Sequence, residues 1–298
     1  MPYRERDSLH RHLRGWIKDL EQSGLGERTL DLYGYWVEEA FRVIGPQDPG
    51  KVTKQDLAKI TLGMGGNRNT LAVKLRMVRV FLRWCGCKDA AKWRINYTQQ
   101  PKIGGVFMSE HQVAMCRESA ERLGPVHAVL FALGADMGLR PIDICRLTLT
   151  NADEFLSQNG SMIRGKGRNG GKVAWQKANR YAKQYIERYL ELRQTQFPGG
   201  TMFLMWKGKN GPRPMNPVDV RKRIAEVSAA SGMTFHPHDL RRTFGHRLWE
   251  QGVELETICL LMRHDSPDTT FKAYIGVTED RLSAAMDKLA PRPLSQSR

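Results

Sequence analysis

The most informative segment of this 298-residue chain is residues 236–245, HPHDLRRTFG. Its first proline suits the first turn of a helix, so a helix is predicted to begin near residue 237. At helical spacing His238, Arg241 and Gly245 share one stripe, while Leu240 and Phe244 share an apolar one. A guanidinium fork beside a residue without a side chain suits close approach to a phosphate. A His/Arg pair on an ordinary surface is the other interpretation of so short a pattern.

Downstream, residues 263–274 read RHDSPDTTFKAY and hold two candidate reactive groups. His264 lies just before a helix predicted at 267–275, and Tyr274 lies on that helix. Taken singly, His264 also fits a capping residue, and Tyr274 also fits a half-buried aromatic.

Upstream, two segments add basic residues to the pattern. Residues 138–147, GLRPIDICRL, place Arg140 at the entrance of a helix that begins with a proline. Residues 161–176 predict two short strands around an Asn-Gly turn at 169–170, because Asn-Gly supplies the positive φ angles of a tight hairpin. Lys166 then lies on the first strand or at its end.

The composition points to a polyanionic partner. The chain carries 47 Lys and Arg against 31 Asp and Glu, a net charge of +16, and 41% hydrophobic residues, enough to bury real cores. No apolar run reaches the roughly 20 residues that span a bilayer, and the polar N-terminus lacks a secretory signal, so we expect no membrane contact. Five cysteines without CxxC spacing predict free thiols, with no disulfide and no zinc.

Residues 1–95 predict a small all-α domain, and residues 96–106, which lose helical periodicity and contain Pro and Gly, predict a linker. The predicted helices of this domain lie at residues 7–23, 27–44, 53–61 and 68–85. One face of the last helix is cationic and is a candidate DNA-binding stripe, formed by Arg68, Arg76, Arg79 and Arg83. An ordinary solvated helix face is the alternative for this stripe.

Residues 107–298 predict a mainly helical second domain with a small antiparallel sheet. The fold class is therefore mostly α, of the α+β type. The predicted helices lie at residues 109–123, 125–136, 177–193, 217–230, 238–250, 254–262, 267–275 and 278–289, with one more that begins at Pro141. Basic residues around the hairpin, a second candidate DNA contact, are Arg164, Arg168 and Lys172.

Together these segments resemble the tyrosine recombinases, the phage integrase and Xer-type enzymes, in the order Arg, Lys, HxxR, His, Tyr. The resemblance covers nearly the whole chain, since the first domain resembles the core-binding domain of the family. It implies a catalytic set of Arg140, Lys166, His238, Arg241, His264 and Tyr274. Tyr274 would form a 3′-phosphotyrosine, Lys166 would be the general acid, and Asp143 would orient a catalytic side chain.

Two positions depart from the family pattern or leave a choice. The family usually has glycine where this chain has Arg263, so either the loop before His264 is shaped differently or Arg263 adds a DNA contact. Lys172 competes with Lys166 as the general acid across the same hairpin.

The resemblance implies a site-specific DNA recombinase that needs neither metal, cofactor nor ATP, and the sequence shows no paired carboxylate cluster of the kind that holds Mg²⁺. It also implies double-stranded DNA as partner, a homodimer on each site, a homotetramer in the synapse, accessory DNA-bending or directionality proteins in some systems, and a cytoplasmic, nucleoid-associated location. The last predicted helix docks either on its own domain or on a neighbouring protomer. The alternatives are a type IB topoisomerase and a catalytically silent DNA-binding protein.

Overall fold

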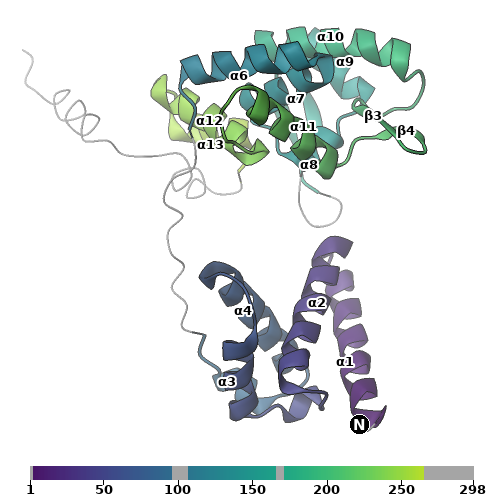
Figure 1. The fold of residues 1–298 in the computed structure, drawn as a ribbon, viewed down its shortest axis with the longest axis vertical. Helices are drawn as coiled ribbons and strands as arrows, with labels where there is room; N and C mark the ends of the chain where they lie inside the picture. The colour runs from purple at the N-terminus through teal and green to yellow at the C-terminus, as the bar shows by residue number, and fades with distance from the viewer. Residues whose placement is uncertain (1–2, 96–106, 166–170, 265–298) are drawn as a thin grey trace, which may run out of the picture. The chain divides into compact units, whose positions relative to one another are not determined.

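The computed structural model describes residues 3–95, 107–165 and 171–264. It divides into two compact units, a first that consists mainly of residues 3–95 and a second that consists of residues 107–165 and 173–264 (Figure 1). Each unit has its own hydrophobic core. The predicted linker, the hairpin turn and the last two predicted helices lie outside the described residues. No helix among the described residues is long and apolar enough to cross a membrane.

The first unit is entirely helical. Its elements are α1 (Tyr3–Gln22), α2 (Glu27–Ile44), the 3-10 turn η1 (Pro49–Lys51), α3 (Lys54–Gly63), α4 (Arg68–Trp84) and α5 (Lys88–Lys92). Thr53 caps α3, since its hydroxyl accepts from the amide of Asp56 at 3.3 Å and the Asp56 carboxylate accepts from the amide of Thr53 at 3.1 Å. Buried aromatic rings join the helices, with the Trp16 and Phe81 centroids 5.2 Å apart.

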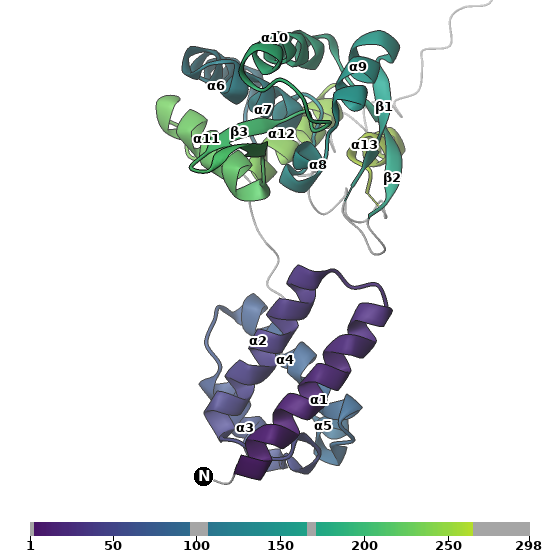
Figure 2. The same ribbon diagram turned by 90° about the vertical axis from the view of Figure 1, so that its right-hand side faces the viewer.

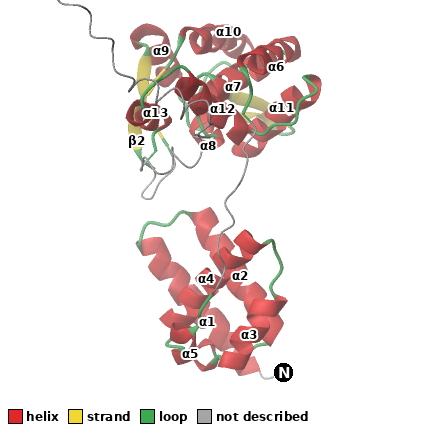
Figure 3. Ribbon diagram, turned by 90° about the vertical axis from the view of Figure 1, so that its left-hand side faces the viewer, coloured by secondary structure: helices red, strands yellow, loops and turns green. Residues whose placement is uncertain are grey.

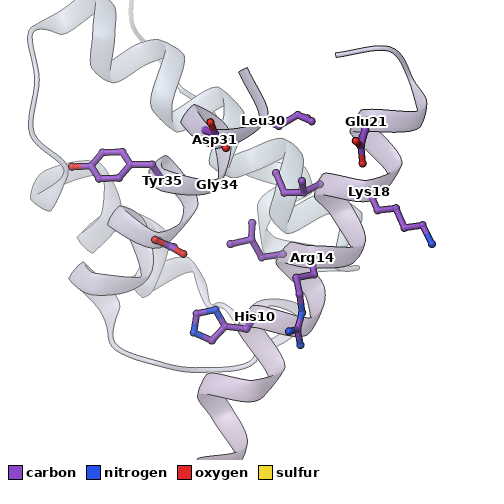
Figure 4. A pocket seen from close by; sticks show the side chains of 11 residues that line it. His10, Arg14, Lys18, Glu21, Leu30, Asp31, Gly34 and Tyr35 are labelled. Atoms are coloured by element: carbon purple, nitrogen blue, oxygen red, sulfur yellow. The ribbon is translucent and has the colours of Figure 1, made fainter. Parts of the chain in front are cut away.

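A shallow groove of about 890 Å³ runs between α1 and α2 of this unit (Figure 4). Leu13, Ile17 and Leu30 form its apolar part. Its remaining lining mixes basic side chains, such as Arg14, with acidic ones, such as Asp31. This mixture of charges does not match the one-signed surface expected for a polyanion.

The second unit is built around α7 (Pro125–Ala135), which is buried over most of its length and packs against α6, α10, α11 and α12 (Figure 2). Its hydrophobic sequence fits burial on every side rather than on one face. The other helices are α6 (Glu110–Leu123), α8 (Pro141–Cys145), α9 (Leu149–Gln158), α10 (Arg180–Gln196), α11 (Pro217–Ala230), α12 (Pro237–Glu250) and α13 (Leu255–Met262).

Two antiparallel strand pairs complete the second unit (Figure 3). The predicted hairpin is formed by β1 (Gly160–Arg164) and β2 (Val173–Lys177), with Gly160 opposite Lys177. The second pair, β3 (Met205–Gly208) and β4 (Gly211–Pro214), was not predicted, because two prolines in β4 argue against a strand and suit only a short edge. The predicted fold class, mostly α with small antiparallel sheets, is confirmed.

Two glycines let α12 approach α7 and the turn that follows it. A Cβ on Gly134 would lie 2.9 Å from Leu240 Cδ1, and one on Gly138 would collide with the ring of Phe244. Gly138 also has a φ of 63°, which favours glycine. The predicted apolar stripe of α12 therefore packs directly against Gly134 and Gly138, in the segment that precedes Arg140.

Gly138→Ala should destabilise the second unit by about 1–3 kcal/mol more than Gly252→Ala does. Both glycines have positive φ, but no atom lies within 4 Å of a Cβ built on Gly252, so that variant isolates the backbone cost. Urea titration read by hydrogen exchange of peptides from α7 measures the difference. Equal losses in the two variants would contradict tight packing of Phe244 on the turn.

Candidate active site

Helix α12 begins at Pro237, as the sequence predicts, and the Asp239 carboxylate accepts from the amide of His236 at 2.9 Å. Arg241, one turn further on, is only 1% exposed. Its guanidinium donates to the main-chain carbonyls of Gly138 and Met262. The stripe expected to lie open to a phosphate is thus largely buried at Arg241 and Gly245, because the arginine connects α12 to two other segments.

Arg140 stands at the N-terminus of α8, in the extended conformation that a following proline favours. Its side chain is 29% exposed. Asp143 is completely buried; its Oδ2 accepts from the Arg140 amide at 3.3 Å and lies 3.8 Å from Arg140 Nη1. The predicted orienting role of Asp143 therefore has a matching contact.

His264 follows the C-terminus of α13, where its amide donates to Cys259 O at 3.1 Å. The residue before it, Arg263, has φ 52° and ψ 50°, a left-handed conformation that favours glycine and costs other residues roughly 1–2 kcal/mol. Its side chain is 5% exposed, and Nη2 donates to Asp143 Oδ2 at 2.7 Å. The guanidinium is turned toward Asp143, which favours the alternative of a differently shaped loop over that of a DNA contact from Arg263.

His238 lies exposed on the first turn of α12, beside the arginines. The protein around the ring removes part of its hydration, and the positive charges of Arg242, Arg241 and Arg140 act in the same direction, so the pKa of His238 is lowered. Asp239 opposes this shift only in part. The neutral imidazole is therefore the main form at neutral pH.

These contacts bring four predicted catalytic residues into one region: Arg140, His238, Arg241 and His264. Lys166, Tyr274 and Arg168 lie outside the described residues. The strand end before Lys166 is fixed, since Arg146 Nη1 donates to Gly165 O at 2.5 Å.

The predicted DNA-binding residues of the hairpin that the structure describes, Arg164 and Lys172, are both exposed. On α4, Arg68, Arg76 and Arg83 are exposed as well. Arg79 differs, because its guanidinium donates to the carbonyls of Ala90 at 3.1 Å and Ala91 at 3.0 Å. It caps the end of α5, which leaves it less available to DNA than the stripe pattern predicts.

The sequence did not single out Arg146 or Arg242, and it did not predict a buried Arg263. A lone arginine in a helix or loop carries no periodic signal, and only the tertiary partners reveal these roles. Beyond the arginines, Met108 N donates to Thr243 Oγ1 at 3.2 Å, and the Phe107 and His246 rings stack 4.4 Å apart, so the start of the second unit is fixed to α12.

Among the residues that the structure describes, no three His, Cys, Asp or Glu side chains are grouped to hold a metal ion. The five cysteines are free thiols, as predicted.

Arg242→Gln should raise the pKa of His238, because one of the positive charges that lower it is removed. NMR titration of the His238 ring in the DNA-free protein measures the midpoint. Arg122→Gln, which alters an exposed arginine paired with Glu118 on α6, is the control and should leave the midpoint unchanged. An unchanged midpoint in Arg242→Gln would exclude the charge of Arg242 as a cause.

A model of the phage integrase family matches residues 94–281. The tyrosine recombinase XerA of Pyrococcus horikoshii is 24% identical over 269 residues, 90% of each chain. The tyrosine recombinase XerC of Staphylococcus saprophyticus is 28% identical over 294 residues, 94% of this chain and 91% of that protein.

Two solved structures show the same fold. The Tn1549 transposon integrase, in complex with circular intermediate DNA, matches with a TM-score of 0.71 at 17% identity, over 94% of this chain and 99% of that one. A lambda integrase from a tetramer bound to a Holliday junction matches with a TM-score of 0.62 at 16% identity, over 97% of this chain and 80% of that one. Since the family model spans more than half of the chain, the resemblance is confirmed, and this chain belongs to the phage integrase family, the tyrosine recombinases.

Proposed function

We propose that this chain is a site-specific DNA recombinase that cuts and rejoins double-stranded DNA through a 3′-phosphotyrosine at Tyr274, without metal or ATP. The observation that carries the proposal is the fixed region, in a member of this family, where the two cations Arg140 and Arg241 lie with His238 and His264. An enzyme that replaces a metal by side chains needs such a region, because its cations must be in place before charge develops on the phosphate.

In the proposed reaction the phenolic oxygen of Tyr274 attacks the scissile phosphorus, and the bond from phosphorus to the 5′-oxygen breaks. Negative charge grows on the non-bridging oxygens, and fixed arginine and histidine donors stabilise it more than they stabilise the ground state. The reverse attack, by a 5′-hydroxyl from another strand, restores the phosphodiester and frees the tyrosine. The energy of the broken bond is kept in the phosphotyrosine, which removes the need for ATP.

The protons of this reaction need a donor and an acceptor. Lys166 is the proposed donor to the leaving 5′-oxygen, with Lys172 as the rival. His238 suits the acceptor role toward the Tyr274 phenol, because its lowered pKa keeps the ring neutral and able to take a proton. A phosphate nearby offsets the arginine charges, so the pKa of His238 rises as DNA binds, and the ring then holds the proton more firmly.

The proposed assembly is a homodimer on each site and a homotetramer in the synapse. The lambda integrase structures, a dimer on a core site and a tetramer on a Holliday junction, support this proposal by their common fold. Residues 1–95 would act as the core-binding domain and residues 107–298 as the catalytic domain. Accessory DNA-bending or directionality proteins and a nucleoid-associated place in the cytoplasm remain predictions.

Incubation with a supercoiled plasmid that carries the DNA flanking its own gene, in EDTA, should give recombined or relaxed DNA and a covalent protein–DNA adduct. Tyr274→Phe should give neither, because it lacks the attacking oxygen. Gel electrophoresis resolves the product topology: relaxation alone would favour the type IB topoisomerase alternative. Tight binding with no adduct, also on a nicked suicide substrate, would favour the silent DNA-binding protein.

Deletion of residues 278–298 should abolish strand exchange and leave DNA binding intact, if the predicted last helix docks on a neighbouring protomer. The apolar positions at 282, 285, 286 and 289 give that helix a face to bury. A gel-shift titration and a recombination assay on the same duplex separate the two activities. Undiminished exchange by the shortened protein would show that the helix does not join protomers.

A further inference from the structure

Arg263 combines two costly features. It is one of two non-glycine residues with positive φ in the described part of the chain, the other being Asn159 at the end of α9. It also buries a guanidinium, with 5% of the side chain exposed. A residue that is strained in its backbone and charged in a buried place depends on a specific partner, which here is Asp143 at 2.7 Å.

Asp143 lies between two arginines. Its Oδ2 is 2.7 Å from Arg263 Nη2 and 3.8 Å from Arg140 Nη1. Its other oxygen, Oδ1, accepts no hydrogen bond from the residues that the structure describes. Because the carboxylate carries one negative charge and its hydrogen bond goes to Arg263, the more exposed Arg140 guanidinium lies outside hydrogen-bonding distance of Asp143 and its charge is only partly compensated.

We propose that Arg263 is a positioning residue, which pairs with Asp143 so that the Arg140 guanidinium stays available to the DNA phosphate, and which ties the His264 loop to α8. This inference rests on the proposed function of the site. Arg263 thus acts through two predicted catalytic residues and does not itself touch the phosphate.

Arg263 has two proposed effects, on the Arg140 side chain and on the His264 loop, and the charge of Asp143 separates them. The tie to the loop is lost whenever Arg263 is replaced, whereas the pull on Arg140 also needs the Asp143 carboxylate. Without the Arg263 guanidinium, the buried Asp143 carboxylate keeps Arg140 as its ion-pair partner among the described residues and draws that side chain inward. If Asp143 is also made neutral, nothing draws Arg140 inward. Removal of the carboxylate should therefore rescue the loss of the arginine, a coupling that independent structural damage at two sites would not produce.

The experiment compares wild type, Arg263→Gly, Asp143→Asn and the double variant on a nicked suicide duplex made from the flanking DNA of the gene. Arg263→Gly should slow adduct formation by roughly 10–100-fold, the size expected when a reacting group is misplaced, with little change in DNA affinity. The double variant should recover most of this loss. Glycine suits a φ of 52°, so Arg263→Gly should fold.

Asn159→Gly is the matched control, since it makes the same backbone change at an exposed site away from Asp143, and it should cleave like wild type. Arg263→Gly that reacts at the wild-type rate, or a double variant no faster than Arg263→Gly, would overturn the inference.

A second readout does not depend on cleavage. In the DNA-free protein, the ¹⁵N NMR signal of the Arg140 guanidinium should show slower rotation in Arg263→Gly than in wild type and regain its wild-type behaviour in the double variant. An Arg140 signal unchanged by Arg263→Gly would also overturn the inference. If wild type forms no adduct, the proposed function fails, and this NMR comparison still decides whether Arg263 keeps Arg140 away from Asp143.

Discussion

The buried guanidinium of Arg241 holds the site together. From α12 it donates hydrogen bonds to the carbonyls of Gly138 and Met262. Gly138 lies two residues ahead of Arg140 in the chain, and Met262 lies two residues ahead of His264. Three segments far apart in the sequence therefore share one charged group. A carbonyl buried without a donor is costly, so displacement of this arginine would leave two such groups and would loosen every element around them.

Glycines and a buried helix make that arrangement possible. Gly134 and Gly138 bring α12 close to α7 and its turn, and α7 is in turn surrounded by α6, α10 and α11. The core of the second unit thus fixes the arginines before any DNA is present. Preorganisation of this kind is what electrostatic stabilisation of a transition state requires, since no reorganisation is then needed during the reaction.

The sequence predicted most of this fold because the informative patterns are local. The helix start at Pro237 and the strands beside the Asn-Gly turn depend on residues that are close in the sequence. The short helix α5 and the β3–β4 pair were not predicted, because their sequences lack a hydrophobic periodicity and they gain stability from tertiary neighbours. At the site, the family pattern singled out Arg140, His238 and His264, whose catalytic roles stay predictions. The burial of Arg241 and the partner of Arg263 depend on contacts across long sequence separations. The contacts of Arg79 with Ala90 and Ala91 depend on the packing of the following helix.

The anchoring of Phe107 and Met108 on α12 has a mechanical consequence. These are the first described residues after the segment that connects the two units, and they are bonded and stacked to Thr243 and His246. Phe107 also packs in the small cluster of Ile258 and Met262, beside the loop that holds His264. A force applied along the chain from the first unit would therefore act on α12, the helix that carries His238 and Arg241. Tension in the connecting segment would thus act on the candidate site itself.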